Sequence, residues 1–183
     1  MALLPDELSI GSIELRRWRT AHLEEVMSAI VISFHELQRW MSWAQEMPSH
    51  EEMLQVLQDG ETVFAADIAW EYFIFEIDSG ELVGMAGLNS SRVGPEAIEI
   101  SYWVRSDRTA RGYATAAART LADIAFARIS TLKSIEIRMD SANAASAAIP
   151  PKLGFEFLCE EDREIRAKAQ TGKGLVWKLE RPA

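Results

Sequence analysis

The sequence has very few of the residues that bind metals or form cross-links. It contains one cysteine, Cys159, which excludes an internal disulfide and a cysteine-based metal site. The three histidines, His22, His35 and His50, lie in the first third of the chain, and no two have the spacing of a metal-binding pair. The sequence therefore predicts a protein that needs no metal.

Positive charge is also scarce. There are 19 lysines and arginines against 28 acidic residues, so the net charge is −9. Nucleic acids and anionic membranes both attract clustered basic residues, and we therefore expect neither as a partner. No apolar run is long enough to span a bilayer, and residues 1–12 lack the pattern of a secretory signal. A cytoplasmic protein is expected.

Apolar residues, in contrast, are plentiful. They make up 48% of the 183 residues, which is enough for one core, and no repeat or shift in composition marks a boundary. We therefore expect a single domain over 1–183. The six tryptophans suggest large aromatic surfaces, either in that core or around a pocket.

The first 65 residues have mainly helical patterns after an alternating strand at 12–18. Three helix starts are expected from residues with capping character or capping-box spacing, namely Thr20, Ser33 with Glu36, and Ser49 with Glu52. Gly60 is expected to end the third helix.

The remainder alternates strands and helices. Strand patterns at 71–77, 81–89 and 98–104 predict an antiparallel meander. A helix at 115–129 and a strand at 133–139 follow, so that 98–139 forms a strand–helix–strand unit with parallel strands. A short helix capped by Asn143 is interrupted by Pro150 and Pro151, and 155–161 with 174–180 predict a closing pair. The fold class is mixed α/β.

The stretch "RTARGYAT" (108–115) joins the end of a strand to the start of a helix. The first N–H groups of a helix have no intrahelical acceptor, and they attract anions. Gly112 would allow a ligand to approach the backbone closely, and Arg108 and Arg111 would add charge. The Walker and dinucleotide motifs are absent. The residues alone leave two readings open, a surface turn and a site for an anionic cofactor.

Three segments together carry a family resemblance: "EISYWV", "ARGYATAAARTL" and "NAASAAIPPKLGFEF". They resemble the GNAT superfamily of acyl-CoA-dependent N-acetyltransferases, and within it the branch of ribosomal-protein N-terminal acetyltransferases. The family's phosphate loop, Gln/Arg-x-x-Gly-x-Gly/Ala, is matched at Gly112 and Ala114 but begins with Thr109, beside which Arg108 offers a charge. The resemblance is specific over about 97–158, which would be the cofactor-binding core.

The resemblance implies a GNAT-like fold, with a mostly antiparallel sheet of about six or seven strands and a splayed parallel pair, 98–104 and 133–139. The pantetheine arm of acetyl-CoA would lie between these strands and contact the backbone of Tyr102, Trp103 and Val104. Asn143 would bond the pantetheine or hold the second strand. The pyrophosphate would rest, with Arg108 at the rim, on the amides of Arg111, Gly112, Tyr113, Ala114 and Thr115.

The resemblance also implies candidate catalytic residues. Glu99 stands where many relatives carry a glutamate, and it would be the general base; the alternative is a solvent-facing or cross-strand-paired glutamate. Pro150 occupies the position of a tyrosine that protonates the leaving thiolate in many relatives. Ser146 would replace it, unless it is simply a small residue under the cofactor. Tyr113 and Tyr102 are weaker alternatives, and the strand pattern favours a place in the core for Tyr102.

The substrate side is expected over 33–50. Trp40 and Trp43 are three positions apart, on one helical face, and form either core or an aromatic wall for the substrate. The expected protein is an acetyl-CoA-dependent N-acetyltransferase, monomeric or homodimeric, that acts on a protein N-terminal amine or a small amine. The alternative is a non-catalytic acyl-CoA-binding module, which Thr109 and Pro150 favour.

Overall fold

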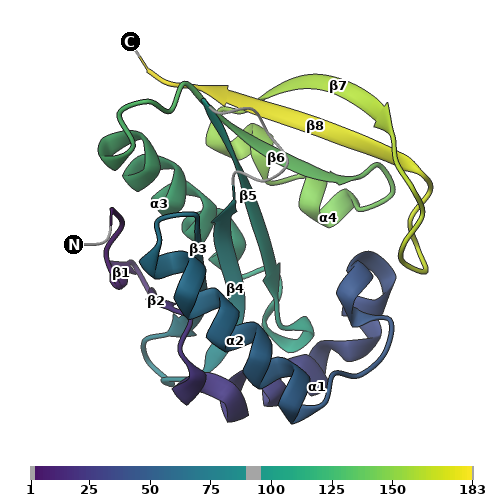
Figure 1. The fold of residues 1–183 in the computed structure, drawn as a ribbon. Helices are drawn as coiled ribbons and strands as arrows, with labels where there is room; N and C mark the ends of the chain where they lie inside the picture. The colour runs from purple at the N-terminus through teal and green to yellow at the C-terminus, as the bar shows by residue number, and fades with distance from the viewer. Residues whose placement is uncertain (1–2, 90–95, 183) are drawn as a thin grey trace.

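The computed structural model describes residues 3–89 and 96–182, and these residues form one sheet of eight strands (Figure 1). The strand order is β1-β2-β3-β4-β5-β6-β8-β7, and every neighbouring pair is antiparallel except β5 with β6. The strands are β1 (Glu7–Ile10), β2 (Ile13–Arg17), β3 (Ala69–Glu76), β4 (Leu82–Asn89), β5 (Ala97–Val104), β6 (Ser134–Asp140), β7 (Glu156–Asp162) and β8 (Lys173–Glu180).

Helices cover both faces of the sheet. They are α1 (Leu23–Trp40), α2 (His50–Ala65), α3 (Tyr113–Arg128) and the single-turn α4 (Ala144–Ala147). The alternation of β5 divides the core: Ile98 and Ile100 pack with α3 residues such as Leu121, whereas Trp103 packs with α1 residues such as Ile30. The two faces of β5 therefore contribute to two separate parts of the core.

Local signals predicted several elements correctly. Ser49 and Glu52 form the expected capping box: the Ser49 hydroxyl accepts the Glu52 N–H at 3.2 Å, and the Glu52 carboxylate accepts the Ser49 N–H at 2.8 Å. The Asn143 side chain caps α4 by accepting the N–H of Ser146 at 3.2 Å. Pro150 then begins a separate 3-10 helix, η4 (Pro150–Leu153), as expected for a residue without an N–H.

The predicted helix start at Ser33 is wrong, because α1 runs unbroken through it. Ser33 is buried, and its hydroxyl accepts the backbone N–H of Ser106 at 3.0 Å. The hydroxyl thus fixes α1 against the connection that follows β5. Thr20 is not a helix cap either, since it begins a 3-10 turn, η1 (Thr20–His22), that precedes α1.

Gly60 does not end the third predicted helix. α2 continues to Ala65, and Gly60 packs directly against Trp18: an added Cβ would lie 2.7 Å from the indole Cε3. The glycine therefore allows close packing between a helix and the segment after β2. The sheet also has one strand more than the six or seven expected, and the sequence reading missed the short β1, whose residues are all partly or fully exposed.

We predict that Ser33→Ala lowers the free energy of unfolding by about 1–3 kcal/mol, because it leaves the Ser106 N–H without an acceptor. Chemical denaturation measures this change. The matched control is Ser28→Ala on the exposed side of α1, which should stay within about 0.5 kcal/mol of the wild type. Equal effects of the two changes would contradict the role assigned to Ser33.

Candidate functional site

The central cavity lies where β5 and β6 separate. Their parallel ladder pairs only Ala97–Ile100 with Ser134–Ile137, and Figure 1 shows the two strands diverging beyond it. The cavity has a volume of about 1690 Å³. Every residue that the sequence predicted for the site lines it: Trp40, Trp43, Glu99, Tyr102, Trp103, Val104, Arg108, Arg111, Gly112, Tyr113, Ala114, Thr115, Asn143 and Ser146.

The 108–115 segment lines this cavity. Ala110 and Gly112 both have positive φ angles, 61° and 82°, and Gly112 is the N-cap of α3. Among the described residues, no N–H group from Thr109 to Thr115 has a hydrogen-bond acceptor. Nothing lies within 4 Å of the position where a Cβ on Gly112 would be. These features form an open, electropositive cradle at the start of a helix, which suits an anion.

The arginines of this segment are already paired. Arg108 binds Glu81 at 2.5 Å, and Arg111 binds Glu76 at 3.1 Å. Glu76 also accepts the hydroxyl of Tyr113, whose ring is buried in the α3 core. The predicted charge at the rim is thus partly neutralised, and the pairs hold the cradle against β3 and the start of β4. Tyr113 can offer the cavity only its backbone.

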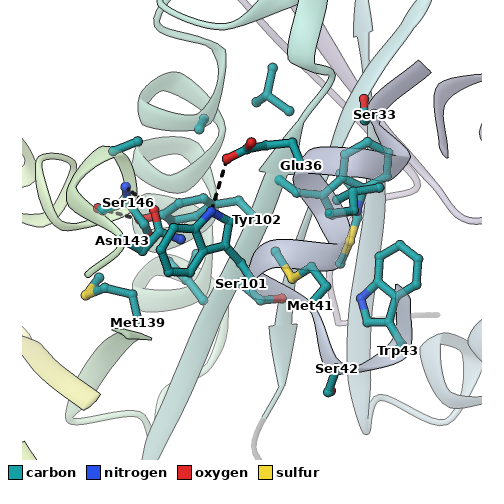
Figure 2. Close-up of a pocket in the computed structure, with 18 of the residues that line it drawn as sticks. Ser33, Glu36, Met41, Ser42, Trp43, Ser101, Tyr102, Met139, Asn143 and Ser146 are labelled. Atoms are coloured by element: carbon teal, nitrogen blue, oxygen red, sulfur yellow. Dashed lines mark hydrogen bonds between the residues drawn. The ribbon is translucent and has the colours of Figure 1, made fainter. Parts of the chain in front are cut away.

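The hydroxyl groups of Tyr102 and Ser146 form a pair on the face of β5 that packs with α3. Tyr102 and Ser146 lie together with Asn143 in Figure 2, and the Ser146 hydroxyl donates to the Tyr102 oxygen at 3.3 Å. Burial raises the pKa of Tyr102 to about 12, although the bond with Ser146 acts in the opposite direction. Tyr102 is therefore a protonated group on the cavity wall rather than the core residue that the sequence favoured. The side chain of Trp103 is buried on the opposite face.

Glu99 is buried on the α1 face of β5, opposite Asn89 of β4 and Glu136 of β6. The reading of Glu99 as a solvent-facing side chain is therefore wrong. Arg138 binds Glu136 at 2.7 Å and Glu161 at 3.0 Å. Burial by itself would lower the pKa of Arg138, but bonding to Glu136 and the charges of Glu136, Glu161 and Glu99 raise it. Glu99 is thus within the electrostatic reach of one arginine.

A second carboxyl in the cavity, Glu71, was missed in the sequence. Glu71 is the first residue of the strand pattern "EYFIFEI", and its side chain lies on the same face as Phe73. It is also close to Gly87, where an added Cβ would overlap the Glu71 carboxyl group. Burial raises its pKa to about 7. Two signals could have revealed it: a glutamate in phase with Phe73 on an apolar face, and a glycine in the neighbouring strand.

The two predicted substrate-binding tryptophans are not in the core, which was one of the two interpretations of the sequence. α1 ends at Trp40, and Trp43, which is 46% exposed, lies in the 3-10 turn η2 (Ser42–Ala44), so they do not share one helical face. Figure 2 shows Trp43 across the cavity from Ser146. The loop between β7 and β8 reaches this wall, since Gln170 donates to the Trp40 carbonyl at 2.9 Å.

The parts of the chain that the structure describes contain neither a candidate metal site nor a candidate membrane-spanning helix. Among residues 3–89 and 96–182, no group of three or more histidine, cysteine or acidic side chains is placed to hold a metal ion. Within the same ranges, no helix has the length and apolar character needed to cross a membrane.

The cradle and the splayed strands fit a family that matches the sequence. The family described as "Acetyltransferase (GNAT) domain" matches residues 12–156, so this chain belongs to the GNAT acetyltransferases. A comparison with curated protein sequences gives no match.

Solved structures of the same fold include ribosomal-protein acetyltransferases. The ribosomal L7/L12 alpha-N-protein acetyltransferase RimL in complex with coenzyme A has a TM-score of 0.85 and 19% identity, over 95% of this chain and 97% of that one. A ribosomal-protein-S5-alanine acetyltransferase from Vibrio fischeri has a TM-score of 0.82 and 14% identity, over 96% of each chain. The microcin C7 self-immunity acetyltransferase MccE, in complex with acetyl-CoA and AMP, has a TM-score of 0.86 and 16% identity, over 98% of each chain.

We predict that Glu71→Gln stabilises the protein at pH 8 but not at pH 4.5. The folded-state pKa of Glu71 is raised from 4.5 to about 7, so ionisation costs stability as the pH rises through this window, up to about 3 kcal/mol above it. A neutral glutamine does not have this cost. Denaturation curves at the two pH values measure the difference, and a gain independent of pH would contradict the burial of a titrating carboxyl.

Proposed function

We propose that this protein is an acetyl-CoA-dependent N-acetyltransferase that transfers an acetyl group to a primary amine, on a protein N-terminus or a small molecule. The observation that carries the proposal is the row of amides from Thr109 to Thr115 without acceptors, in a segment that lines the cavity between the separated ends of β5 and β6. RimL and MccE, whose structures contain coenzyme A and acetyl-CoA, support it as proteins of the same fold.

The segment 97–158 would supply the cofactor site. The amides of Arg111 to Thr115 would hold the pyrophosphate, because its charge complements their unused N–H groups. The backbone of Tyr102–Val104 would pair with the pantetheine amides as an added strand would, since the β5–β6 ladder stops at Ile100 and Ile137. Asn143 has its carbonyl oxygen committed to capping α4, so its amide NH₂ is the part available for the pantetheine.

The acetyl-CoA thioester would supply the activated acyl group. Glu99 would take the proton that the acceptor nitrogen loses as the new bond forms, because it lies buried on the acceptor side of β5. On the opposite side, the Tyr102 hydroxyl donates to the Ser146 backbone carbonyl at 3.3 Å, and it would redirect this hydrogen bond to the departing sulfur. The Ser146 hydroxyl would continue to donate to the Tyr102 oxygen. The raised pKa of Tyr102 keeps its proton in place at neutral pH. The buried Pro150 offers no such donor.

The acceptor would occupy the α1 side of the cavity, where the end of α1 and the loop joining β7 to β8 are hydrogen-bonded to each other and form one wall. Trp40 and Trp43 line this side of the cavity, together with Met41 and Met47. Aromatic rings and thioethers accommodate apolar or cationic groups of many shapes. Glu36 accepts the Trp40 indole N–H at 3.1 Å and thereby holds the ring that forms the wall.

Two features favour a second candidate, a non-catalytic acyl-CoA-binding module. Thr109 begins the phosphate loop in place of the family's glutamine or arginine, and Pro150 replaces a tyrosine. Release of coenzyme A thiol in the presence of a panel of amines and peptides with free N-termini separates the two candidates. Binding of acetyl-CoA without thiol release from any amine would support the second.

We predict that Gly112→Glu reduces coenzyme A affinity at least about 100-fold. The side chain would be strained at a φ of 82° and would place a carboxylate among the amides that receive the pyrophosphate. Calorimetric titration measures the loss. Gly80→Glu, another positive-φ glycine but outside the cavity lining, is the matched control and should bind normally. Unchanged affinity of the Gly112 variant would contradict the cradle.

We predict that Glu99→Gln lowers turnover by about 100-fold or more while acetyl-CoA affinity stays within about twofold of the wild type, because the amide cannot accept a proton. Thiol release at saturating acetyl-CoA, together with a binding titration, measures both quantities. Wild-type turnover in this variant would remove Glu99 from the mechanism.

A further inference from the structure

The β3 side of the cavity contains a carboxyl group that the proposed mechanism does not use. Glu71 lies near the start of β3, where its backbone carbonyl accepts the N–H of Trp18 at 3.0 Å. Its side chain turns across the sheet toward β4. An added Cβ on Gly87 would overlap the Glu71 carboxyl, so the missing side chain at 87 provides the space in which this group lies.

This placement brings Glu71 close to the proposed reaction centre. Gly87 pairs with Glu71 on one side and with Ser101 of β5 on the other. A carboxyl group above β4 is therefore about one strand spacing, roughly 4.8 Å, from the β5 backbone. Ser101 directly precedes the Tyr102–Val104 segment proposed to hold the pantetheine. Glu71 also shares with Glu99 the face of the sheet that bears α1.

One oxygen of this carboxyl has no hydrogen-bond partner among the described residues. Its Oε2 atom is buried without a hydrogen-bond partner, and so is the indole Nε1 of Trp18, which lines the same cavity. Apolar side chains line this part as well, including Met53, Phe73 and Met85. A buried carboxylate without a partner is costly, and a protein retains one where a ligand supplies the missing donor.

The charged groups on neighbouring elements are engaged elsewhere. Arg16 of β2 binds Glu14 and stacks on Phe75. On α2, Glu52 belongs to the capping box, and Glu61 accepts the N–H of Thr20. His22, which packs edge-on against Phe73, and Glu99 of β5 also lie on this face. So do Glu136 and Arg138 of β6, which bind each other. Burial is the sole cause of the raised pKa of Glu71, so none of these charges offsets it.

We propose that Glu71 binds the ammonium group of the acceptor and removes its first proton, and that the acceptor is a primary amine with an apolar substituent. The proposal rests on the proposed function and extends it to the acceptor. The cation supplies the partner that Glu71 lacks, and the apolar lining receives the adjoining carbons. Phenethylamine combines these two features and is the probe used below.

The protons then balance across two carboxyl groups. The ammonium nitrogen gives one proton to Glu71 and gains a lone pair. That lone pair forms the C–N bond to the acetyl carbon, and the C–S bond breaks with its electrons left on sulfur. The second nitrogen proton passes through Glu99 to the thiolate, and Glu71 returns its own proton to solvent. The net products are an N-acetyl amine, coenzyme A thiol and one proton.

The kinetic test compares phenethylamine with β,β-difluorophenethylamine, a similar amine whose fluorines make the nitrogen less basic. At pH 7 Glu71→Gln should lower kcat/KM about 100-fold with phenethylamine but less than about tenfold with the difluoro amine, which needs little deprotonation. Glu99→Gln should impair both. Glu51→Gln, an exposed glutamate of α2 outside the cavity, is the matched control and should change neither. Equal losses with both amines in Glu71→Gln would overturn the proposal.

A binding readout separates this proposal from the proposed function. In the wild-type coenzyme A complex with carboxyl-¹³C glutamate, the Glu71 resonance, assigned by its absence in Glu71→Gln, should shift on titration with phenethylammonium. Gly87→Ala, which displaces the carboxyl without removing it, should abolish that shift. If the Glu71 resonance does not shift when phenethylammonium is added, the proposed ammonium site is overturned, even if acetylation occurs. A protein that acetylates no amine but shows the shift loses the proposed function and keeps the site.

Discussion

The early end of the ladder between β5 and β6 is the constraint on which the rest of the site depends. Four residue pairs join the strands, and beyond Ile100 and Ile137 they diverge. Backbone groups along separated strand edges need partners, and an amide-bearing ligand can provide them. The cavity lies where the strands separate, and the first turn of α3 lines it. β5 contributes Tyr102, beside Ser146, from one of its faces and Glu99 from the other.

Charge within the cavity is distributed unevenly. The arginines beside the cradle are paired with Glu76 and Glu81, and Arg138 is shared between Glu136 and Glu161. The amides from Thr109 to Thr115 and the carboxyl of Glu71 have no such internal partners. The first set suits an anion and the second a cation. The proposed reaction between an anionic acetyl donor and a cationic acceptor requires both kinds of group.

The sequence predicted those parts of the site that rest on local chemistry. Gly112 ahead of an alanine-rich helix and Asn143 as a cap each depend on a few adjacent residues, and both are confirmed. Ser33 and Gly60 were misread because contacts with residues distant in the sequence outweigh their local signals. The Ser33 hydroxyl accepts the Ser106 N–H, and Gly60 packs against Trp18. The phase of Glu71 with Phe73 was a local signal for a buried carboxyl, but the space that Gly87 provides for it depends on the register of β3 with β4.

The most direct test of the account is a crystal structure of this protein grown with acetyl-CoA. The account predicts the diphosphate on the amides of Arg111 to Thr115, the pantetheine along Tyr102–Val104, and the acetyl group beside Ser101, facing Glu99 and Glu71. A cradle without phosphate and a cofactor bound elsewhere on the protein would contradict it.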